Sequence, residues 1–325
     1  MISELAILDL VREDLDRVEQ KMRTMGESAY GPLAEAFLRL LGSGGKRLRP
    51  ALALGTFGFF VDRASEKAVA LAAAVETLHN ATLVHDDLID GAPVRRGNIT
   101  LNAIWNRGAT VLAGDYLFAR AAGFAAETEN IRVVQLFADT LRIICEGELR
   151  QLFSTRQWSQ PKESYYPRIF AKTASLFASA TRSAAILGGA SSEQEDALYE
   201  YGYHLGMAFQ IVDDILDYSG DETVLGKPVG GDLRQGIITL PFFHFLQTSP
   251  DPQGIIAMLE REPDGNGDGV GEVVALVRAS DAMALTFQEA SDFTEQAKAD
   301  LERLPAGPYQ DALRQLADFG ITRHL

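Results

Sequence analysis

The sequence predicts an all-α protein, built as a single large bundle of long helices. Apolar residues recur at steps of three and four along most of the chain, and the alternation typical of a strand is hard to find. No Pro/Ser-rich linker and no fixed-period repeat divides the chain, so residues 1–325 are expected to form one domain. Apolar residues make up 46% of the chain, which is ample for a large core.

Helices are expected throughout, interrupted by two polar segments rich in Gly. Ser192 and Glu195 have the spacing of a capping box at the start of one helix. Of the Gly-rich segments 219–232 and 263–272, the second is expected to be a solvated surface loop, because Ala275 stands where a calcium loop needs its closing Glu. The expected helices are 3–24, 31–42, 49–61, 65–90, 109–127, 130–156, 162–188, 193–219, 236–247, 252–262, 281–303 and 307–320.

Charge and cysteine content exclude several classes of protein. The formal net charge is −15, so the surface as a whole repels phosphate, which argues against nucleic acid as a partner. The single cysteine, Cys145, excludes a disulfide framework and is expected to be a small buried apolar residue. There is no signal-peptide pattern and no apolar run long enough to span a bilayer, so we expect a cytoplasmic protein without an integral membrane segment.

The strongest chemical signal is a D-D-x-x-D pattern that occurs twice, as DDLID from Asp86 and as DDILD from Asp213. The first and last aspartates of each pattern are four residues apart, so on a helix their carboxylates share one face. The candidate metal ligands are Asp86, Asp87, Asp90, Asp213, Asp214 and Asp217.

Both aspartate patterns lie in strongly apolar sequence, where a carboxylate cluster is unfavourable unless a cation neutralises it. Magnesium prefers oxygen ligands and is commonly held by one or two carboxylates together with substrate phosphates. Two such helices facing each other across a bundle would form one site for two or three magnesium ions. That site would bind a diphosphate despite the negative charge of the chain.

Basic residues gather near the first aspartate pattern and before it. In GGKRLRP, Lys46 and Arg49 can converge on one anion, which Arg binds bidentately. Arg95 and Arg96 follow the first pattern in an expected loop. They either pair with the aspartates or grip the far side of a metal-bound diphosphate, and their closeness to DDLID favours the second role.

Four further polar residues are placed to contribute to the same site. His79 lies two helical turns before the first aspartate pattern, and Gln210 lies three residues before the second. Lys172 and Thr173 interrupt an apolar helix, where the Thr hydroxyl can bond back to a carbonyl and bend the helix.

Taken in order, these motifs resemble those of the trans-isoprenyl diphosphate synthases, or polyprenyl synthetases. GGKRLRP, HDDLIDGAPVRRG, KT, FQIVDDILD and GKPVGGD follow one another between Gly44 and Asp232. The resemblance implies an isoprenoid-synthase fold of long helices around a deep central cavity, usually a homodimer. It also implies a magnesium-dependent prenyltransferase that condenses an allylic diphosphate with isopentenyl diphosphate.

The resemblance further implies a role for each motif residue. Asp86 and Asp90 would bind the magnesium ions that hold the allylic diphosphate, and Asp213 would bind another, with Asp214 and Asp217 in support. The residues implied to hold isopentenyl diphosphate are Lys46, Arg49, His79 and Arg96. Those implied to contact the allylic substrate during catalysis are Arg95, Lys172, Thr173, Gln210 and Lys227.

The length of the product is predicted from the side chains one turn before Asp86, which are Ala81 and Thr82. In short-chain members of the family a bulky aromatic near this position acts as a floor. This chain has no Phe, Tyr or Trp between Val75 and Asp90, so a product of C30 or longer is preferred. A farnesyl or geranylgeranyl product stays open, because another helix can supply the floor.

Three other functions compete with this interpretation. His85 and Asp86 form the pair typical of an HD-type phosphohydrolase, but that chemistry needs further histidines beside acidic clusters. A terpene cyclase or head-to-head condensing enzyme would not need GGKRLRP to hold isopentenyl diphosphate. A regulatory subunit of a two-component synthase should lose its aspartates, whereas this chain keeps all six.

Overall fold

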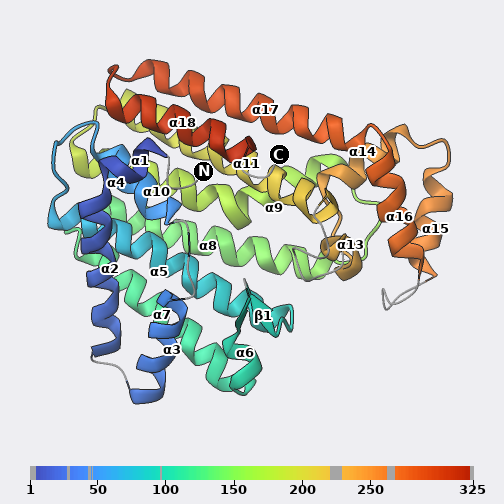
Figure 1. Cartoon of the computed structure of the whole chain (residues 1–325), viewed down its shortest axis with the longest axis horizontal. Helices are drawn as coiled ribbons and strands as arrows, with labels where there is room; N and C mark the ends of the chain where they lie inside the picture. The colour runs from blue at the N-terminus through green and yellow to red at the C-terminus, as the bar shows by residue number, and fades with distance from the viewer. Residues whose placement is uncertain are drawn as a thin grey trace. The chain divides into compact units, whose positions relative to one another are not determined.

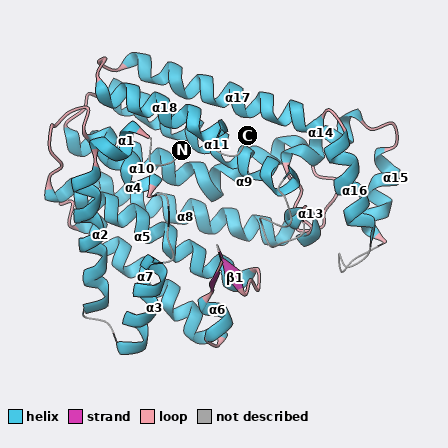
Figure 2. Cartoon of the chain, viewed as in Figure 1, coloured by secondary structure: helices cyan, strands magenta, loops and turns pink. Residues whose placement is uncertain are grey.

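The computed structural model describes residues 5–27, 30–42, 45, 47–95, 97–219, 229–261 and 268–322. These residues are overwhelmingly helical, and the strands β1 (Val94–Arg95) and β2 (Asn98–Ile99) form one small antiparallel ribbon, as Figure 2 shows. The predicted all-α fold class is therefore confirmed. From the N-terminus, the first helices are α1 (Ala6–Leu10), α2 (Arg12–Glu27), α3 (Gly31–Gly42), α4 (Leu48–Phe57), α5 (Glu66–Ile89), α6 (Leu101–Ile104), α7 (Arg107–Ala126) and α8 (Ile131–Ser154).

The later helices include one turn of unusual geometry, a π-helical turn at Phe170–Ala174. Short 3₁₀ turns lie at Lys162–Ser164 and Leu301–Arg303. The α-helices are α9 (Tyr165–Ile169), α10 (Ser175–Gly188), α11 (Ser192–Ser219), α13 (Gly231–Gln235), α14 (Leu240–Thr248), α15 (Pro252–Glu260), α16 (Asp268–Ala279), α17 (Ala282–Asp300) and α18 (Pro308–Thr322).

The chain divides into two compact units. Unit 1 comprises Met1–Asp139, Ser179–Tyr199 and Arg303–Leu316, and unit 2 comprises Thr140–Ala178, Glu200–Glu302 and Ala317–Leu325. The expectation of one domain over the whole chain stays a prediction.

Helix α5 is the central element of unit 1. The Ser65 hydroxyl caps its N-terminus by accepting a bond from the Ala68 amide at 3.2 Å. All residues from Ala68 to Leu78 are buried, as expected for a helix that is apolar on every side. Helix α7 lies alongside α5 (Figure 1), and Gly114 permits the approach, since a methyl group there would lie 2.1 Å from His85 Nε2.

The core of unit 2 gathers buried aromatic and aliphatic side chains from the segment between Trp158 and Ala290. Two glycines let neighbouring helices approach the π-helical turn. A Cβ on Gly147 of α8 would lie 2.4 Å from Ala171 Cβ, and a Cβ on Gly206 of α11 would lie 2.5 Å from Ala174 Cα. The π-helical turn is thus held between two close backbones.

Several local predictions were wrong. Residues from Asp268 onward form the helix α16 rather than a loop, because Val270, Val273 and their neighbours are buried in the core of unit 2. Residues 262–267 lie outside the described residues. Cys145 is exposed rather than buried, because it lies on a solvent-facing side of α8.

The capping box before α11 is shifted by one residue from its predicted position. The Ser191 hydroxyl accepts from the Gln194 amide at 3.3 Å, and Gln194 Oε1 accepts from the Ser191 amide at 3.0 Å. Glu195, which was predicted to close the box, instead accepts a hydrogen bond from Arg132 Nη1 at 2.9 Å.

Candidate active site

The first aspartate pattern occupies the C-terminal end of α5 in unit 1. Asp86 is half-buried, and Asp90 is exposed at the residue that ends the helix. Asp87 is only 6% exposed, and its Oδ1 accepts a charged hydrogen bond from Arg95 Nε at 2.7 Å. The β1–β2 ribbon carries Arg95 back over the helix. Two roles were considered for Arg95, and in this structure it pairs with an aspartate, Asp87.

The basic run contacts helix α5 in unit 1. Arg49 lies in the first turn of α4, and its Nη1 is 3.2 Å from His79 Nε2. Arg47 does not join this pair, because its Nη1 donates to Glu76 Oε1 at 2.9 Å. Two of the four residues implied to hold isopentenyl diphosphate therefore lie together, beside the Arg47 cation that is already balanced by the buried carboxylate of Glu76.

The α5 residues one turn before Asp86 are closely packed. Ala81 is completely buried, and the Thr82 hydroxyl donates to the His79 carbonyl at 2.8 Å. His85 faces helix α7, with its Nε2 3.1 Å from the Val111 carbonyl. This contact does not favour a metal-binding histidine of the HD type.

The second aspartate pattern lies near the end of α11 in unit 2, in different surroundings. Asp213 is exposed, whereas Asp214 is 2% exposed and Asp217 is half-buried. Asp217 accepts from two backbone amides, Gly231 at 3.0 Å and Asp232 at 3.1 Å. The end of the GKPVGGD motif thus folds back onto the aspartate helix.

Burial gives this second cluster an unusual protonation behaviour. It raises the pKa of Asp214 to about 7 and that of Asp217 to about 7, and the charge of nearby Asp232 acts in the same direction. Hydrogen bonds to each carboxyl oppose the rise. The cluster therefore carries more negative charge than its surroundings stabilise, and a divalent cation would relieve it.

Lys172 and Thr173 lie on the π-helical turn of unit 2. π-helical turns often occur at functional sites, because they redirect the side chains of a helix. Lys172 Nζ is 3.9 Å from Glu148 Oε1. The Thr173 hydroxyl donates to Gln210 Oε1 at 2.6 Å, so it does not make the expected bond to a backbone carbonyl. Ser175 makes that type of bond instead, to the Ala171 carbonyl at 3.0 Å.

Sequence reasoning missed Tyr165 and Glu148 as members of this region. The Tyr165 hydroxyl donates to Asp214 Oδ2 at 2.7 Å, from a side chain that is fully buried. Its position two helical turns before Lys172 is the only sequence signal that could have found it. Lys46, Arg96 and Lys227 were predicted site residues and lie outside the described residues.

The donor set suits a hard cation. In the described part of the chain, no three His, Cys, Asp or Glu side chains converge closely enough to hold a metal ion by themselves. Each aspartate pattern offers oxygen ligands without histidine or thiolate, which matches magnesium or calcium rather than zinc. Such ions commonly complete their coordination with water and substrate phosphates.

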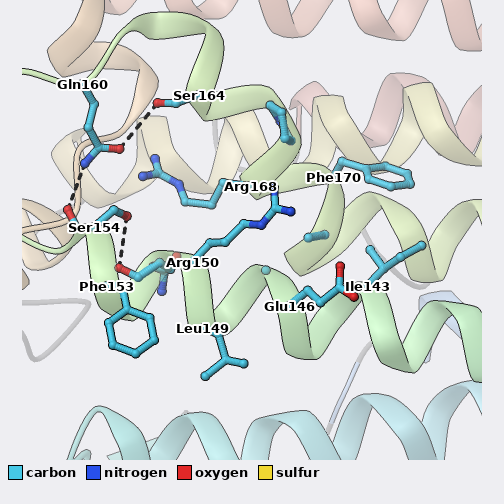
Figure 3. Close-up of a pocket in the computed structure, with 14 residues that line it drawn as sticks. Ile143, Glu146, Leu149, Arg150, Phe153, Ser154, Gln160, Ser164, Arg168 and Phe170 are labelled. Carbon is cyan, nitrogen blue, oxygen red and sulfur yellow. Dashed lines mark hydrogen bonds between the residues drawn. The ribbon is translucent and has the colours of Figure 1, made fainter.

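A pocket of about 620 Å³ also lies in unit 2, between α8 and residues 160–171. Figure 3 shows the side chains of Arg150 and Arg168 lying between these two walls, with Phe153 and Phe170 toward its ends. The residues predicted from the motifs are absent from its lining. The pocket adjoins the π-helical turn through Phe170 and Ala171, and its lining does not include Thr173 or Asp214.

Comparison with known proteins assigns the family. A family model described as polyprenyl synthetase matches residues 31–277. The chain belongs to the polyprenyl synthetase family. It is 38% identical over 315 residues to heptaprenyl diphosphate synthase component 2 of Geobacillus stearothermophilus, covering 96% of each chain.

Solved structures of the polyprenyl synthetase family agree in fold. Heptaprenyl diphosphate synthase from Staphylococcus aureus superposes with a TM-score of 0.92 at 32% identity, covering 97% of this chain and 99% of that one. A polyprenyl synthase from Caulobacter crescentus CB15, complexed with calcium and isoprenyl diphosphate, has a TM-score of 0.92 at 33% identity, covering 100% and 98%.

The predicted enzyme class, a prenyl diphosphate synthase of the prenyltransferases, is confirmed by these comparisons. Members of this family use a divalent metal. Among the helices that the structure describes, none has the length and apolar character needed to cross a bilayer.

Proposed function

We propose that this enzyme condenses an allylic diphosphate with isopentenyl diphosphate to build an all-trans polyprenyl diphosphate of C30 or longer. The observation that carries the proposal is the pair of D-D-x-x-D patterns, each near the end of a long helix, in a chain related over 96% of its length to a heptaprenyl diphosphate synthase component. The absence of Phe, Tyr and Trp from the α5 segment before Asp86 supports the long product.

Both aspartate patterns take part in the reaction. Asp86 and Asp90 would hold magnesium ions for the allylic diphosphate, and Asp213 would hold another, giving two or three ions in total. Asp87 and Asp217 support these ligands from the same helices. When bound, magnesium neutralises the charge that develops on the departing diphosphate. Arg49 and His79, which lie 3.2 Å apart, bind isopentenyl diphosphate with Lys46 and Arg96.

The reaction breaks the bond between the allylic carbon and the diphosphate oxygen, and the diphosphate leaves with the electron pair. The double bond of isopentenyl diphosphate then attacks the allylic cation and forms the new carbon–carbon bond. A proton is lost to the released diphosphate, which restores a double bond and leaves a longer allylic diphosphate.

Basic and polar side chains stabilise the cation and the leaving group. Lys172, together with Lys227 and Arg95, provides positive charge near the diphosphate, while Thr173 and Gln210 contribute oxygen dipoles that stabilise the developing cation. Water must be excluded from this step, because it would capture the cation as an alcohol.

The enzyme is also proposed to act as a homodimer in the cytoplasm. The end of α8 presents Leu149, Leu152 and Phe153 with 53%, 46% and 80% exposure, and an apolar group of this kind favours burial against a second copy. Sedimentation of wild type and Phe153→Asp tests this. A dimer that the substitution dissociates supports the proposal, and a monomeric wild type contradicts it.

Incubation with radiolabelled isopentenyl diphosphate, farnesyl diphosphate and magnesium chloride tests the function, with products resolved by length. A ladder that ends at C30 or beyond is expected. A ladder that stops at C20 would contradict the product length while keeping the reaction. No incorporation with geranyl, farnesyl or geranylgeranyl diphosphate would contradict the proposed activity of this chain by itself.

A further inference from the structure

A chain of three hydrogen bonds links the π-helical turn to the core of unit 2. The Thr173 hydroxyl donates to Gln210 Oε1 at 2.6 Å, and Gln210 Nε2 donates to Asp214 Oδ1 at 2.9 Å. The Tyr165 hydroxyl donates to Asp214 Oδ2 at 2.7 Å. The network therefore begins at a residue proposed to face the substrate and ends at a tyrosine with no access to solvent.

The direction of each bond follows from the chemistry of the carboxylate. Both Asp214 oxygens accept in this network, one from the Tyr165 hydroxyl and the other from the Gln210 amide, so the amide turns its nitrogen toward Asp214. The amide oxygen then faces Thr173, and it takes the single proton of the Thr173 hydroxyl. The Thr173 oxygen is left with lone pairs only, which is the polarity that a developing cation requires.

Tyr165 is held in place by packing on several sides. Its ring meets Tyr166 edge-on with centroids 5.5 Å apart, and Phe243 edge-on at 6.3 Å. The Arg168 guanidinium lies over the ring at 5.5 Å and donates to the Ile238 carbonyl. The phenol therefore has little freedom to rotate, and its hydroxyl stays on Asp214.

We propose that Tyr165 and Asp214 are positioning residues, which act through Gln210 to fix the orientation of the Thr173 hydroxyl toward the allylic substrate. Both carboxylate oxygens of Asp214 are bonded within this network, and the side chain is 2% exposed. Its role is therefore to orient Gln210 rather than to ligate the metal. This inference rests on the proposed prenyltransferase function.

The variant Tyr165→Phe tests the inference by removing one hydroxyl from a packed ring. Its matched control is Tyr218→Phe, because Tyr218 is equally buried on the same unit and its hydroxyl makes no hydrogen bond of good geometry in the described part of the chain. Tyr165→Phe should lower kcat about tenfold, leave the KM for isopentenyl diphosphate unchanged, and release more farnesol per condensation. The magnesium concentration for half-maximal rate should not move, whereas Asp213→Asn should raise it.

A double-mutant cycle separates positioning from general stability. Thr173→Val removes the hydroxyl through which Tyr165 is proposed to act, so Tyr165→Phe combined with Thr173→Val should be no slower than Thr173→Val alone. Additive losses would overturn the inference, as would a Tyr165→Phe enzyme that matches Tyr218→Phe in kcat and farnesol release. If wild type makes no prenyl product, the proposed function fails instead.

Discussion

The two aspartate patterns share one sequence form but balance their charge differently. In unit 1 the middle aspartate, Asp87, is buried against the cation Arg95. In unit 2 the middle aspartate, Asp214, is buried against the neutral donors Tyr165 and Gln210. The first cluster therefore contains its own counter-charge, whereas in the second cluster burial, together with the charge of nearby Asp232, raises the pKa of Asp214 and Asp217.

This difference indicates a division of roles between helices that look alike in sequence. A cluster that contains an arginine can hold its shape before any ion arrives. A cluster held by neutral donors is stabilised most when a divalent cation binds, so metal binding and local stability should be linked more strongly in unit 2.

The largest expected effect comes from removing a leading aspartate. Asp86→Ala or Asp213→Ala should each abolish turnover, by more than about a hundredfold, because each removes a proposed metal ligand. Far-UV circular dichroism should show unchanged helicity in both. Retained activity in both variants would refute the assignment of the two clusters.

A methyl group on α11 should disturb unit 2 nearly as strongly. Gly206→Ala places a Cβ 2.5 Å from Ala174 Cα, so the π-helical turn and Thr173 must shift. We expect kcat to fall about a hundredfold, since small displacements of reacting groups are costly. Gly123→Ala on α7 is the control, because a Cβ there meets nothing within 4 Å. Equal activity of the two variants would contradict the role of the close approach.

The pH dependence of stability should differ between the clusters. The pKa of Asp214 and Asp217 lies near 7 in the folded chain, above the value of about 4 for an unfolded Asp. Between these two pH values, the folded chain binds more protons at Asp214 and Asp217 than the unfolded chain does. The contribution of these two groups to the unfolding free energy therefore falls as pH rises from about 4 to about 7, and it is constant at higher pH.

Urea unfolding of metal-free protein across this pH range measures that contribution. The fall in unfolding free energy with rising pH should be smaller in Asp217→Asn than in wild type. At pH 8, magnesium should stabilise wild type more than the variant. Identical pH profiles for wild type and Asp217→Asn would show that the second cluster carries no such excess charge.

Removing the counter-charge in unit 1 should have a smaller effect. Arg95→Ala leaves the buried Asp87 carboxylate without its charged donor and should lower the unfolding free energy by about 1 kcal/mol, because Arg95 is itself partly exposed. Arg95→Lys should recover part of the loss. Thermal unfolding of wild type, Arg95→Ala and Arg95→Lys measures the change in stability. Unchanged stability in Arg95→Ala would contradict the proposal that Arg95 neutralises the charge of Asp87.

The smallest expected effect on turnover concerns the α5 wall and appears in product length. Ala81→Phe should shorten the product, because it places an aromatic ring one turn before Asp86. Ala81 is fully buried, so Thr82→Phe at a half-buried position provides a second test if the first variant unfolds. Unchanged product length in a folded variant would mean that the wall lies elsewhere.

The sequence predicted the long helices and their motifs well. Helices α5 and α11 have long periodic apolar patterns, so the positions of Asp86 and Asp213 on them could be foreseen. Arg49 and His79, which the resemblance implies hold the same substrate, lie 3.2 Å apart.

Features that depend on tertiary contact were not predicted. The π-helical turn exists where Gly147 and Gly206 let two helices approach, and neither glycine signals this from its own neighbours in sequence. Tyr165 joins Asp214 across 49 residues, so its role depends on packing that periodicity does not encode. Helix α16 was mistaken for a loop because burial of its valines outweighs its Gly-rich start.

Calorimetric binding of a non-reacting analogue, farnesyl thiodiphosphate, tests the central claim most directly. It should be measured for wild type, Asp86→Ala and Asp213→Ala, each with magnesium and with EDTA. We expect wild type to bind only with magnesium, and each substitution to weaken binding by about tenfold or more. Equal affinity in EDTA, or undiminished affinity in both variants, would contradict the proposed role of the two aspartate patterns in binding the diphosphate through magnesium.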